Sequence, residues 1–202
     1  MKKNNKKTLV FSGIILIIFM SLMIYSLKQD PNFNPSQLVG KEAPSFVAED
    51  TNGRNINTKD IFLKDNWVVL NFWSSFCVVC RSEAPEIENF YKTVTLNSDN
   101  IKKPTFISIN IQDDKKSILE WQQNYGQTFA VLQDTKGLIS VRYGVTGTPE
   151  TFFIDPNGIV RYRIAGQISK NLIFNFISWL EKNPSATQEE VTQALKTVRS
   201  NS

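Results

Sequence analysis

The sequence predicts an α/β domain with a mixed sheet, and three observations lead to that fold class. Two apolar, β-branched runs, at 67–73 and 104–111, are each followed by apolar residues at helical spacing. Two further extended runs, at 151–154 and 159–164, flank Asp155-Pro156-Asn157-Gly158, which is typical of a hairpin turn. Strand–helix units followed by an antiparallel hairpin give a sheet with both kinds of pairing, flanked by helices.

The first half of the domain contains three expected elements before the second strand. Residues 45–56 form two short extended runs around Asn52-Gly53, which indicates a hairpin. The run 67–73 is apolar along nearly its whole length, so we expect a strand buried on both faces. From Cys77 to about residue 94 the apolar positions follow helical spacing, and Pro85 is expected to kink that helix.

The second half alternates shorter elements. Residues 114–125 predict a helix that Gly126 ends, because glycine readily adopts the left-handed conformation at a helix C-terminus. A short strand at 128–132 and a short helix at 135–143 follow. After the hairpin, residues 169–182 carry an apolar face typical of an amphipathic helix.

The C-terminal tail, residues 184–202, has weaker signals. Thr187 and Glu190 form a candidate capping box, and Val191, Leu195 and Val198 follow at helical spacing. The tail is therefore either a small docking helix or a frayed surface helix, and we favour the surface helix.

Composition excludes several function classes. The 202 residues include no histidine, which excludes Ser-His-Asp and Cys-His catalysis and haem attachment through Cys-x-x-Cys-His. Two cysteines leave too few ligands for an ordinary structural zinc site, so we expect no metal and no bound cofactor. With 41% hydrophobic and 21% charged residues, the chain can bury a core.

The net charge of +4 comes from the N-terminal end. Residues 1–28 contain five lysines and no acid, which leaves 18 basic and 19 acidic side chains in the rest of the chain. Because the body of the protein is nearly neutral, a basic nucleic-acid face is disfavoured and we expect no nucleic-acid partner.

Residues 9–27 are nineteen residues without a charge, long enough as a helix to cross a bilayer of about 30 Å. Lysines precede them, so the positive-inside rule places the N-terminus in the cytoplasm and the domain outside. A cleaved signal peptide and a buried core helix are the alternatives, and an uncleaved anchor is favoured because no small-x-small cleavage site follows. The expected organisation is an anchor at 1–28, a tether at 29–37, a domain at 38–183 and the tail.

Cys77 and Cys80 form a Cys-x-x-Cys motif where the strand at 67–73 ends and a helix begins. A helix N-terminus stabilises a thiolate at the first cysteine, so Cys77 is expected to attack and Cys80 to resolve the mixed disulfide. The alternatives are a structural disulfide, half of a zinc site, Cu(I) delivery or two inert thiols. Thr148-Pro149 is a second candidate, because an X-Pro bond can be cis and would then expose the Thr148 backbone to an extended substrate. The alternative is an ordinary loop proline, which the local sequence alone favours.

Two stretches, VLNFWSSFCVVCRSE at 69–83 and YGVTGTPETFFID at 143–155, resemble the thioredoxin fold. More narrowly, they are similar to the membrane-anchored periplasmic thiol:disulfide oxidoreductases of cytochrome c maturation, the DsbE/CcmG type of the TlpA/ResA-like branch. The similarity covers about residues 39–180 and includes Ala43-Pro44-Ser45-Phe46 with Asn52-Gly53. It implies a thioredoxin-like mixed sheet preceded by one transmembrane helix.

The resemblance implies roles for individual residues. Cys77 is the nucleophile, Cys80 the resolving thiol, Pro149 a cis-proline beside them and Glu150 an acid near the active site. Three further residues are expected to form a substrate groove around this pair: Trp73, Phe76 and Thr148.

The resemblance also implies partners and a location. The partners are apocytochrome c or another thiol-containing client, a membrane electron donor of the thiol-reductant transporter type, and the bilayer through residues 9–27. The location is the bacterial inner membrane, with a single span and the C-terminal domain on the periplasmic side. The activity is reduction, with the Cys77–Cys80 disulfide as the redox group and no other cofactor.

Three departures from the family pattern affect these expectations. Phe76 replaces a tryptophan, and Val78-Val79 replaces a dipeptide that contains proline or is polar, which leaves the redox potential open. Asn71 stands where cytosolic thioredoxins have a buried aspartate, and it cannot titrate. We therefore hypothesise that Glu150, helped by Glu83 or Glu86, handles the Cys80 proton.

Other functions stay open. A general thiol reductase with other clients, and an anchored, non-catalytic module with a structural disulfide, both fit the sequence. A thiol peroxidase is disfavoured because Ser74 stands where Thr-x-x-Cys would need threonine.

Overall fold

The structure is a computed structural model that describes residues 5–28, 36–62, 64–96 and 103–200. It divides the chain into two units, Met1–Pro35 and Ser36–Ser202. In the first unit, α1 (Asn5–Lys28) is a single helix whose side chains are exposed over residues 10–26. Most of the predicted tether lies outside the described residues.

Membrane crossing was the expectation for residues 9–27. None of the helices that the described residues form combines the length and the hydropathy that a membrane span requires. The anchor stays a prediction from the charge pattern.

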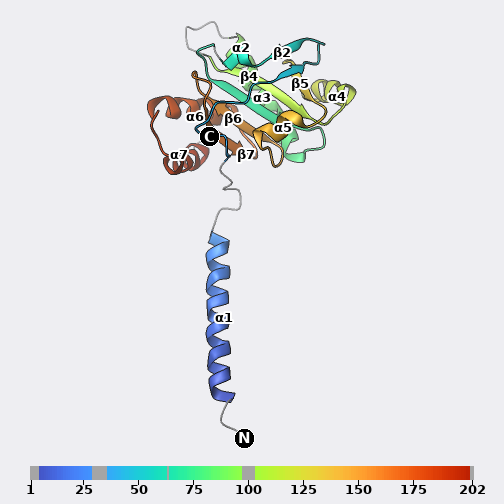
Figure 1. Cartoon of the computed structure of the whole chain (residues 1–202). Coiled ribbons are helices and arrows are strands. Elements are labelled where there is room, and N and C mark those ends of the chain that lie inside the picture. The colour runs from blue at the N-terminus through green and yellow to red at the C-terminus, as the bar shows by residue number, and fades with distance from the viewer. Residues whose placement is uncertain (1–4, 29–35, 63, 97–102, 201–202) are drawn as a thin grey trace. The chain divides into compact units, whose positions relative to one another are not determined.

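The second unit is built on a five-stranded mixed sheet with the order β5-β4-β3-β6-β7 (Figure 1). Its central strand β3 pairs in parallel with β4, and β4 pairs in parallel with β5. On its other side β3 pairs antiparallel with β6, and β6 with β7. The strands are Val68–Trp73 (β3), Thr105–Ile111 (β4), Val131–Asp134 (β5), Glu150–Ile154 (β6) and Val160–Ala165 (β7). The predicted α/β class with a mixed sheet is confirmed.

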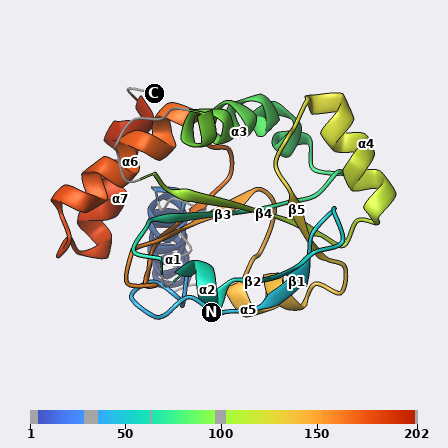
Figure 2. The same cartoon turned by 90° about the horizontal axis from the view of Figure 1, so that it is seen from above.

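Helices cover both faces of this sheet, as the view in Figure 2 shows. One face carries α3 (Val78–Leu96), α4 (Lys115–Tyr125), α6 (Lys170–Lys182) and α7 (Gln188–Ser200). The other carries α2 (Lys59–Phe62), α5 (Leu138–Tyr143) and the hairpin of β1 (Val47–Glu49) and β2 (Asn55–Asn57). The chain was expected to turn at Asn52-Gly53, and the antiparallel pairing of β1 with β2 confirms that hairpin.

The alternation of side chains along β3 separates the two cores. Val69 and Trp73 pack on the face covered by α3 and α6, whereas Val68, Leu70 and Phe72 pack on the opposite face. Every residue of β3 is buried. The central strand therefore lies between two apolar layers, and its C-terminal end at Trp73 is the point from which the chain enters α3.

The helix boundaries follow the capping residues. Asp114 caps α4 by accepting a hydrogen bond from Ser117 N, and Gly126 ends α4 in the left-handed conformation. α5 begins three residues later than expected, at Leu138, because residues before it form a turn closed by a hydrogen bond from Gly137 N to Asp134 O. β5 likewise begins at Val131 rather than 128, and the short helix α2 was not predicted.

The favoured interpretation of the tail as a surface helix is wrong. Glu190 and Thr187 form the predicted capping box, but Val191 and Leu195 are buried in the same apolar cluster as the core residues of α6. Tyr162 Oη on β7 also lies 3.0 Å from Thr192 Oγ1 of α7. The helix docks because its apolar residues pack against α6 and the adjacent edge strand β7.

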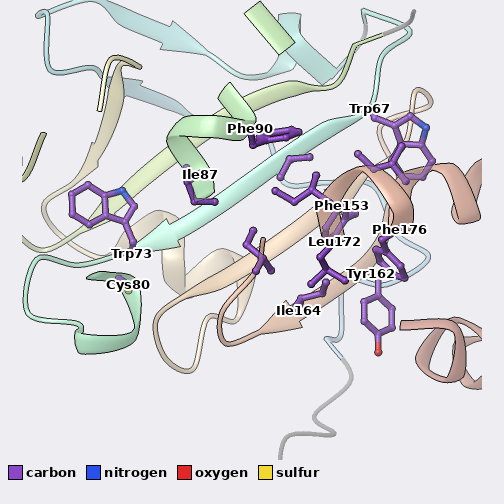
Figure 3. Packing of buried hydrophobic residues seen from close by; sticks show 14 of the residues in the cluster. Trp67, Trp73, Cys80, Ile87, Phe90, Phe153, Tyr162, Ile164, Leu172 and Phe176 are labelled. Carbon is purple, nitrogen blue, oxygen red and sulfur yellow. The ribbon is translucent and has the colours of Figure 1, made fainter. Parts of the chain in front are cut away.

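Figure 3 shows the apolar packing between the sheet and α6, where Phe153 of β6 contacts Phe176. Both rings are fully buried, and they pack edge to face with their centroids 5.1 Å apart. Phe153→Ala removes this ring and leaves a cavity, so we expect a loss of about 3–5 kcal/mol in the free energy of unfolding. Urea unfolding of the oxidised protein measures this loss.

Phe76→Ala is the matched control, because the same ring is deleted where it is 82% exposed. Its expected effect on unfolding is within about 0.5 kcal/mol. Equal losses in the two variants would contradict the packing described here.

Candidate active site

Cys77 and Cys80 form a disulfide at the junction of β3 and α3. Cys80 is only 1% exposed and belongs to the core, whereas Cys77 is half-exposed. In Figure 3 Cys80 lies near Trp73 at the C-terminal end of β3. One sulfur can therefore be reached from solvent and the other cannot.

Cys77 is the N-cap residue of α3. Arg81 N donates to Cys77 O at 3.3 Å, and Cys80 N donates to Cys77 Sγ at 3.0 Å. The sulfur thus occupies the position that a serine or threonine oxygen takes in an ordinary N-cap. In the reduced protein, a thiolate at this position accepts a backbone hydrogen bond and faces the positive end of the helix dipole.

The Thr148–Pro149 peptide bond is cis, as the family resemblance implied. Cys77 Sγ lies 3.3 Å from Thr148 O, so the structure brings the two predicted sites together although 71 residues separate them. Pro149 is buried and Thr148 is half-buried. The loop therefore borders the accessible sulfur.

The three predicted groove residues differ in exposure. Phe76 is exposed beside the disulfide and Thr148 is half-buried. Trp73 is buried, with its Nε1 donating to Ser108 Oγ at 2.8 Å. Trp73 thus supports the site from beneath rather than from its surface.

Glu150 serves the loop that carries the cis-proline. Its Oε1 accepts hydrogen bonds from Thr146 N, Thr146 Oγ1 and Gly147 N at 2.8–3.2 Å. Its Oε2 forms a buried ion pair with Arg163 at 3.3 Å. These contacts hold residues 146–148 in place. The hypothesis that Glu150 moves the Cys80 proton stays a prediction.

Glu83 is the acid that the structure places beside Cys80. It is 2% exposed, its Oε1 accepts from Asn71 Nδ2 at 3.2 Å, and its Oε2 accepts from Ile168 N at 3.1 Å. From the sequence, Glu83 was expected only to help Glu150. The signal for a larger role was its spacing, because residues three apart on a helix share a face and Cys80 is one of the core residues of α3.

A small cavity joins Glu83 to the buried sulfur. Its free volume of about 10 Å³ has room for about one water molecule, and Cys80, Glu83, Asn71 and Trp73 all line it. Burial raises the pKa of Glu83 to about 7, although the hydrogen bonds from Ile168 and Asn71 oppose the shift. A carboxyl group that titrates near neutral pH can accept or return the Cys80 proton.

Among the described residues, no group of three or more potential metal ligands comes together. The site offers a pair of sulfurs, a nearby carboxyl group and a loop beside the accessible sulfur.

The raised pKa of Glu83 makes stability depend on pH. Between about 4.5 and about 7 the folded protein keeps a proton that the unfolded chain has released. The free energy of unfolding should therefore fall as the pH rises through this range, by up to about 3 kcal/mol, and level off above it. Glu83→Gln should lose this part of the pH dependence, as measured by urea unfolding from about pH 4 to about pH 8.

Glu189→Gln is the control, since it makes the same substitution at an exposed position of α7. We expect it to keep the wild-type slope. An unchanged slope in Glu83→Gln would show that burial of this carboxyl does not govern its titration.

Comparison with known proteins agrees with this geometry. The sequence profile of the AhpC/TSA family matches residues 39–163. The thiol-disulfide oxidoreductase ResA of Bacillus subtilis is 30% identical over 181 residues, which cover 89% of this chain and 96% of ResA. The thiol:disulfide interchange protein DsbE of Escherichia coli K12 is 30% identical over 171 residues, which cover 81% of this chain and 88% of DsbE.

Solved structures show the same fold. A thiol:disulfide interchange protein of the thioredoxin family from Chlorobium tepidum superposes with a TM-score of 0.54 at 27% identity, covering 68% of this chain and 90% of its own. DsbF of MTB superposes with a TM-score of 0.58 at 26% identity, covering 67% of this chain and 94% of its own. The chain therefore belongs to the AhpC/TSA family, among the thioredoxin-fold thiol-disulfide oxidoreductases of the ResA and DsbE type.

Proposed function

We propose that this oxidoreductase reduces disulfides in client proteins outside the cytoplasm, with Cys77 as nucleophile and Cys80 as resolving thiol. The unequal exposure of the two sulfurs is the observation that carries the proposal. Only Cys77 is accessible to a client, and its sulfur lies beside the cis-proline loop. A purely structural disulfide needs neither feature.

The exchange proceeds in two balanced steps. The Cys77 thiolate attacks one sulfur of a client disulfide, which forms a mixed disulfide and releases the other client sulfur as a thiolate that takes up a proton. Cys80 then loses its proton and attacks Cys77 Sγ, which releases the second client thiolate and leaves the Cys77–Cys80 disulfide. The second client thiolate also takes up a proton, so the client gains two electrons and two protons. The dithiol supplies both electrons and the Cys80 proton, and solvent supplies the other proton.

Glu83 is the proposed acceptor of the Cys80 proton, because it shares the cavity with Cys80 and burial raises its pKa to about 7. Glu150 is the candidate that the sequence favoured, and its carboxylate is occupied by the loop and by Arg163. Glu83→Gln should slow resolution of a mixed disulfide at neutral pH. Glu150→Gln should instead change the free energy of unfolding and leave the resolution rate as it is. Equal resolution rates in wild type and Glu83→Gln would rule out Glu83.

The proposed client class is apocytochrome c, whose haem-binding cysteines must be thiols, and the electron donor is a membrane protein of the thiol-reductant transporter type. The support is similarity: the sequence pattern resembles that of oxidoreductases of cytochrome c maturation, and the relatives include ResA and DsbE. A general thiol reductase with other clients is the alternative, and the choice of peptide in the assay separates the two.

The proposed location is the outer face of the bacterial inner membrane, with α1 as a single-pass anchor. The support is the uncharged stretch 9–27 behind basic residues, together with the exposure of side chains 10–26, which a lipid environment would cover. After carbonate extraction, the full chain should stay with the membrane and a chain lacking residues 2–28 should not. Extraction of both forms would exclude an anchor.

Trapping tests the assignment of the two cysteines. Cys80→Ser removes the resolving thiol, so its Cys77 should accumulate a mixed disulfide with an oxidised Cys-x-x-Cys-His peptide. Cys77→Ser is the matched control and should trap none, because the remaining sulfur is 1% exposed. Non-reducing electrophoresis and mass spectrometry measure the adduct.

Two further measurements decide the direction of electron flow and the identity of the client. An equilibrium potential against glutathione as oxidising as about −120 mV would indicate a disulfide donor and contradict the reductase assignment. Equal rates with a peptide of the same composition in which the two cysteines are far apart would favour the general reductase.

A further inference from the structure

The segment that precedes Cys77 is held by a side chain from another strand. Residues 74–77 form a turn in which Cys77 N donates to Ser74 O at 3.1 Å, and they belong to neither β3 nor α3. Asp113 lies just after β4 and accepts hydrogen bonds from Ser75 N at 2.7 Å and from Ser75 Oγ at 2.9 Å. The loop that presents the nucleophile is therefore fixed to the end of the neighbouring parallel strand.

Asp113 is itself held from behind. Asn110, the partner of Trp73 in the β3–β4 register, donates from Nδ2 to Asp113 Oδ2 at 2.6 Å. Asn110 Oδ1 in turn accepts from Asp113 N at 3.2 Å. Both residues are buried, Asp113 at 4% and Asn110 at 1% exposure. The carboxyl group thus has little freedom to move away from the loop.

The contacts of Asp113 fit a carboxylate that keeps its negative charge. In each of its three side-chain hydrogen bonds, a carboxylate oxygen of Asp113 accepts from an N–H or O–H group. The ion pairs formed by the described residues do not include Asp113, so no lysine or arginine among them neutralises it. Ser75 and Cys77 are two residues apart, which limits the distance between their Cα atoms to about 7.6 Å.

A buried negative charge bonded to Ser75, two residues before Cys77, acts against a Cys77 thiolate, in the direction opposite to the α3 dipole. Charged groups near the disulfide include Glu83, which lines the same cavity as Cys80, and the exposed Arg81 in the first turn of α3. Glu150, which holds the loop before the cis-proline, is paired with Arg163. Among these, Asp113 is the charge whose hydrogen bonds attach directly to the turn that carries Cys77.

We propose that Asp113 is a positioning residue that also acts electrostatically. It fixes the turn before Cys77 and disfavours the Cys77 thiolate, which keeps the reduced pair a strong electron donor. Stabilising the thiolate of such a pair stabilises its reduced form and makes it a better oxidant. A carboxylate in this place has the opposite effect. The inference rests on the proposed reductase function, since it explains how the pair stays reducing despite its place at a helix N-terminus.

The test compares Asp113→Asn with Asp114→Asn in the reduced full-length protein. Both variants remove one negative charge from adjacent positions, but Asp114 is an exposed helix cap, and asparagine caps as well as aspartate. The readouts are the pH of half-maximal alkylation of Cys77, assigned by mass spectrometry, and the equilibrium constant with glutathione.

Asp113→Asn should lower the alkylation midpoint, raise the alkylation rate at neutral pH several-fold, and shift the glutathione equilibrium towards the dithiol. Asp114→Asn should match wild type in both. A merely structural role for Asp113 would change the rate at every pH without moving the midpoint. That result, or a midpoint equal to that of Asp114→Asn, overturns the proposal.

Two arrangements keep the outcome decisive. If Asp113→Asn does not fold, as judged by near-ultraviolet circular dichroism, Asp113→Ser supplies a second neutral side chain able to accept a hydrogen bond, with the same expected shifts. If the wild-type potential is that of an oxidant, the proposed function fails, while the comparison of midpoints still decides the role of Asp113.

Discussion

A single buried polar contact, between Asn71 and Glu83, connects the parts of the molecule on which the site depends. Asn71 Nδ2 donates to Glu83 Oε1 at 3.2 Å and to Thr151 Oγ1 at 3.0 Å, and Glu83 Oε2 receives Ile168 N. These three hydrogen bonds link β3, β6, α3 and the segment before α6 inside a largely apolar layer. Buried polar groups are tolerated when each finds a partner, and then they fix a unique arrangement. Here they fix the angle at which α3, with Cys77 at its start, leaves the sheet.

Around that centre, the site is built from three supports that come from distant parts of the chain. Asp113 holds the turn before Cys77, Glu150 holds the loop that carries the cis-proline, and Glu83 lies beneath Cys80. All three are carboxyl groups, and their environments differ. Asp113 has hydrogen bonds alone, Glu150 also has an arginine partner, and Glu83 lines a cavity. Because histidine is absent from the chain, these acids and the backbone provide the electrostatics of the disulfide.

Local signals predicted much of the fold. Asn52-Gly53 and Gly126 mark a turn and a helix end by backbone chemistry, and the structure places both as expected. The Cys77–Cys80 spacing at a strand–helix junction likewise identified the centre of the site, and the resemblance identified Pro149 as its neighbour.

Contacts between segments that are distant in the sequence could not be predicted in this way. Glu83 was expected only to help Glu150, and the tail was favoured as a surface helix, because the burial of each depends on segments that are distant in the sequence. Asp113 carried no motif, since its side chain contacts Ser75, 38 residues away.

In the proposed exchange, the contrast between a half-exposed Cys77 and a buried Cys80 also determines the kinetic order. Only the formation of the mixed disulfide depends on how much client is present, because it needs an encounter at the exposed sulfur. The resolving step takes place between two sulfurs of one polypeptide, three residues apart, so it is first order and gains the high effective concentration of an intramolecular reaction. The lifetime of the mixed disulfide is therefore set by the geometry around the two cysteines and does not depend on the concentration of client.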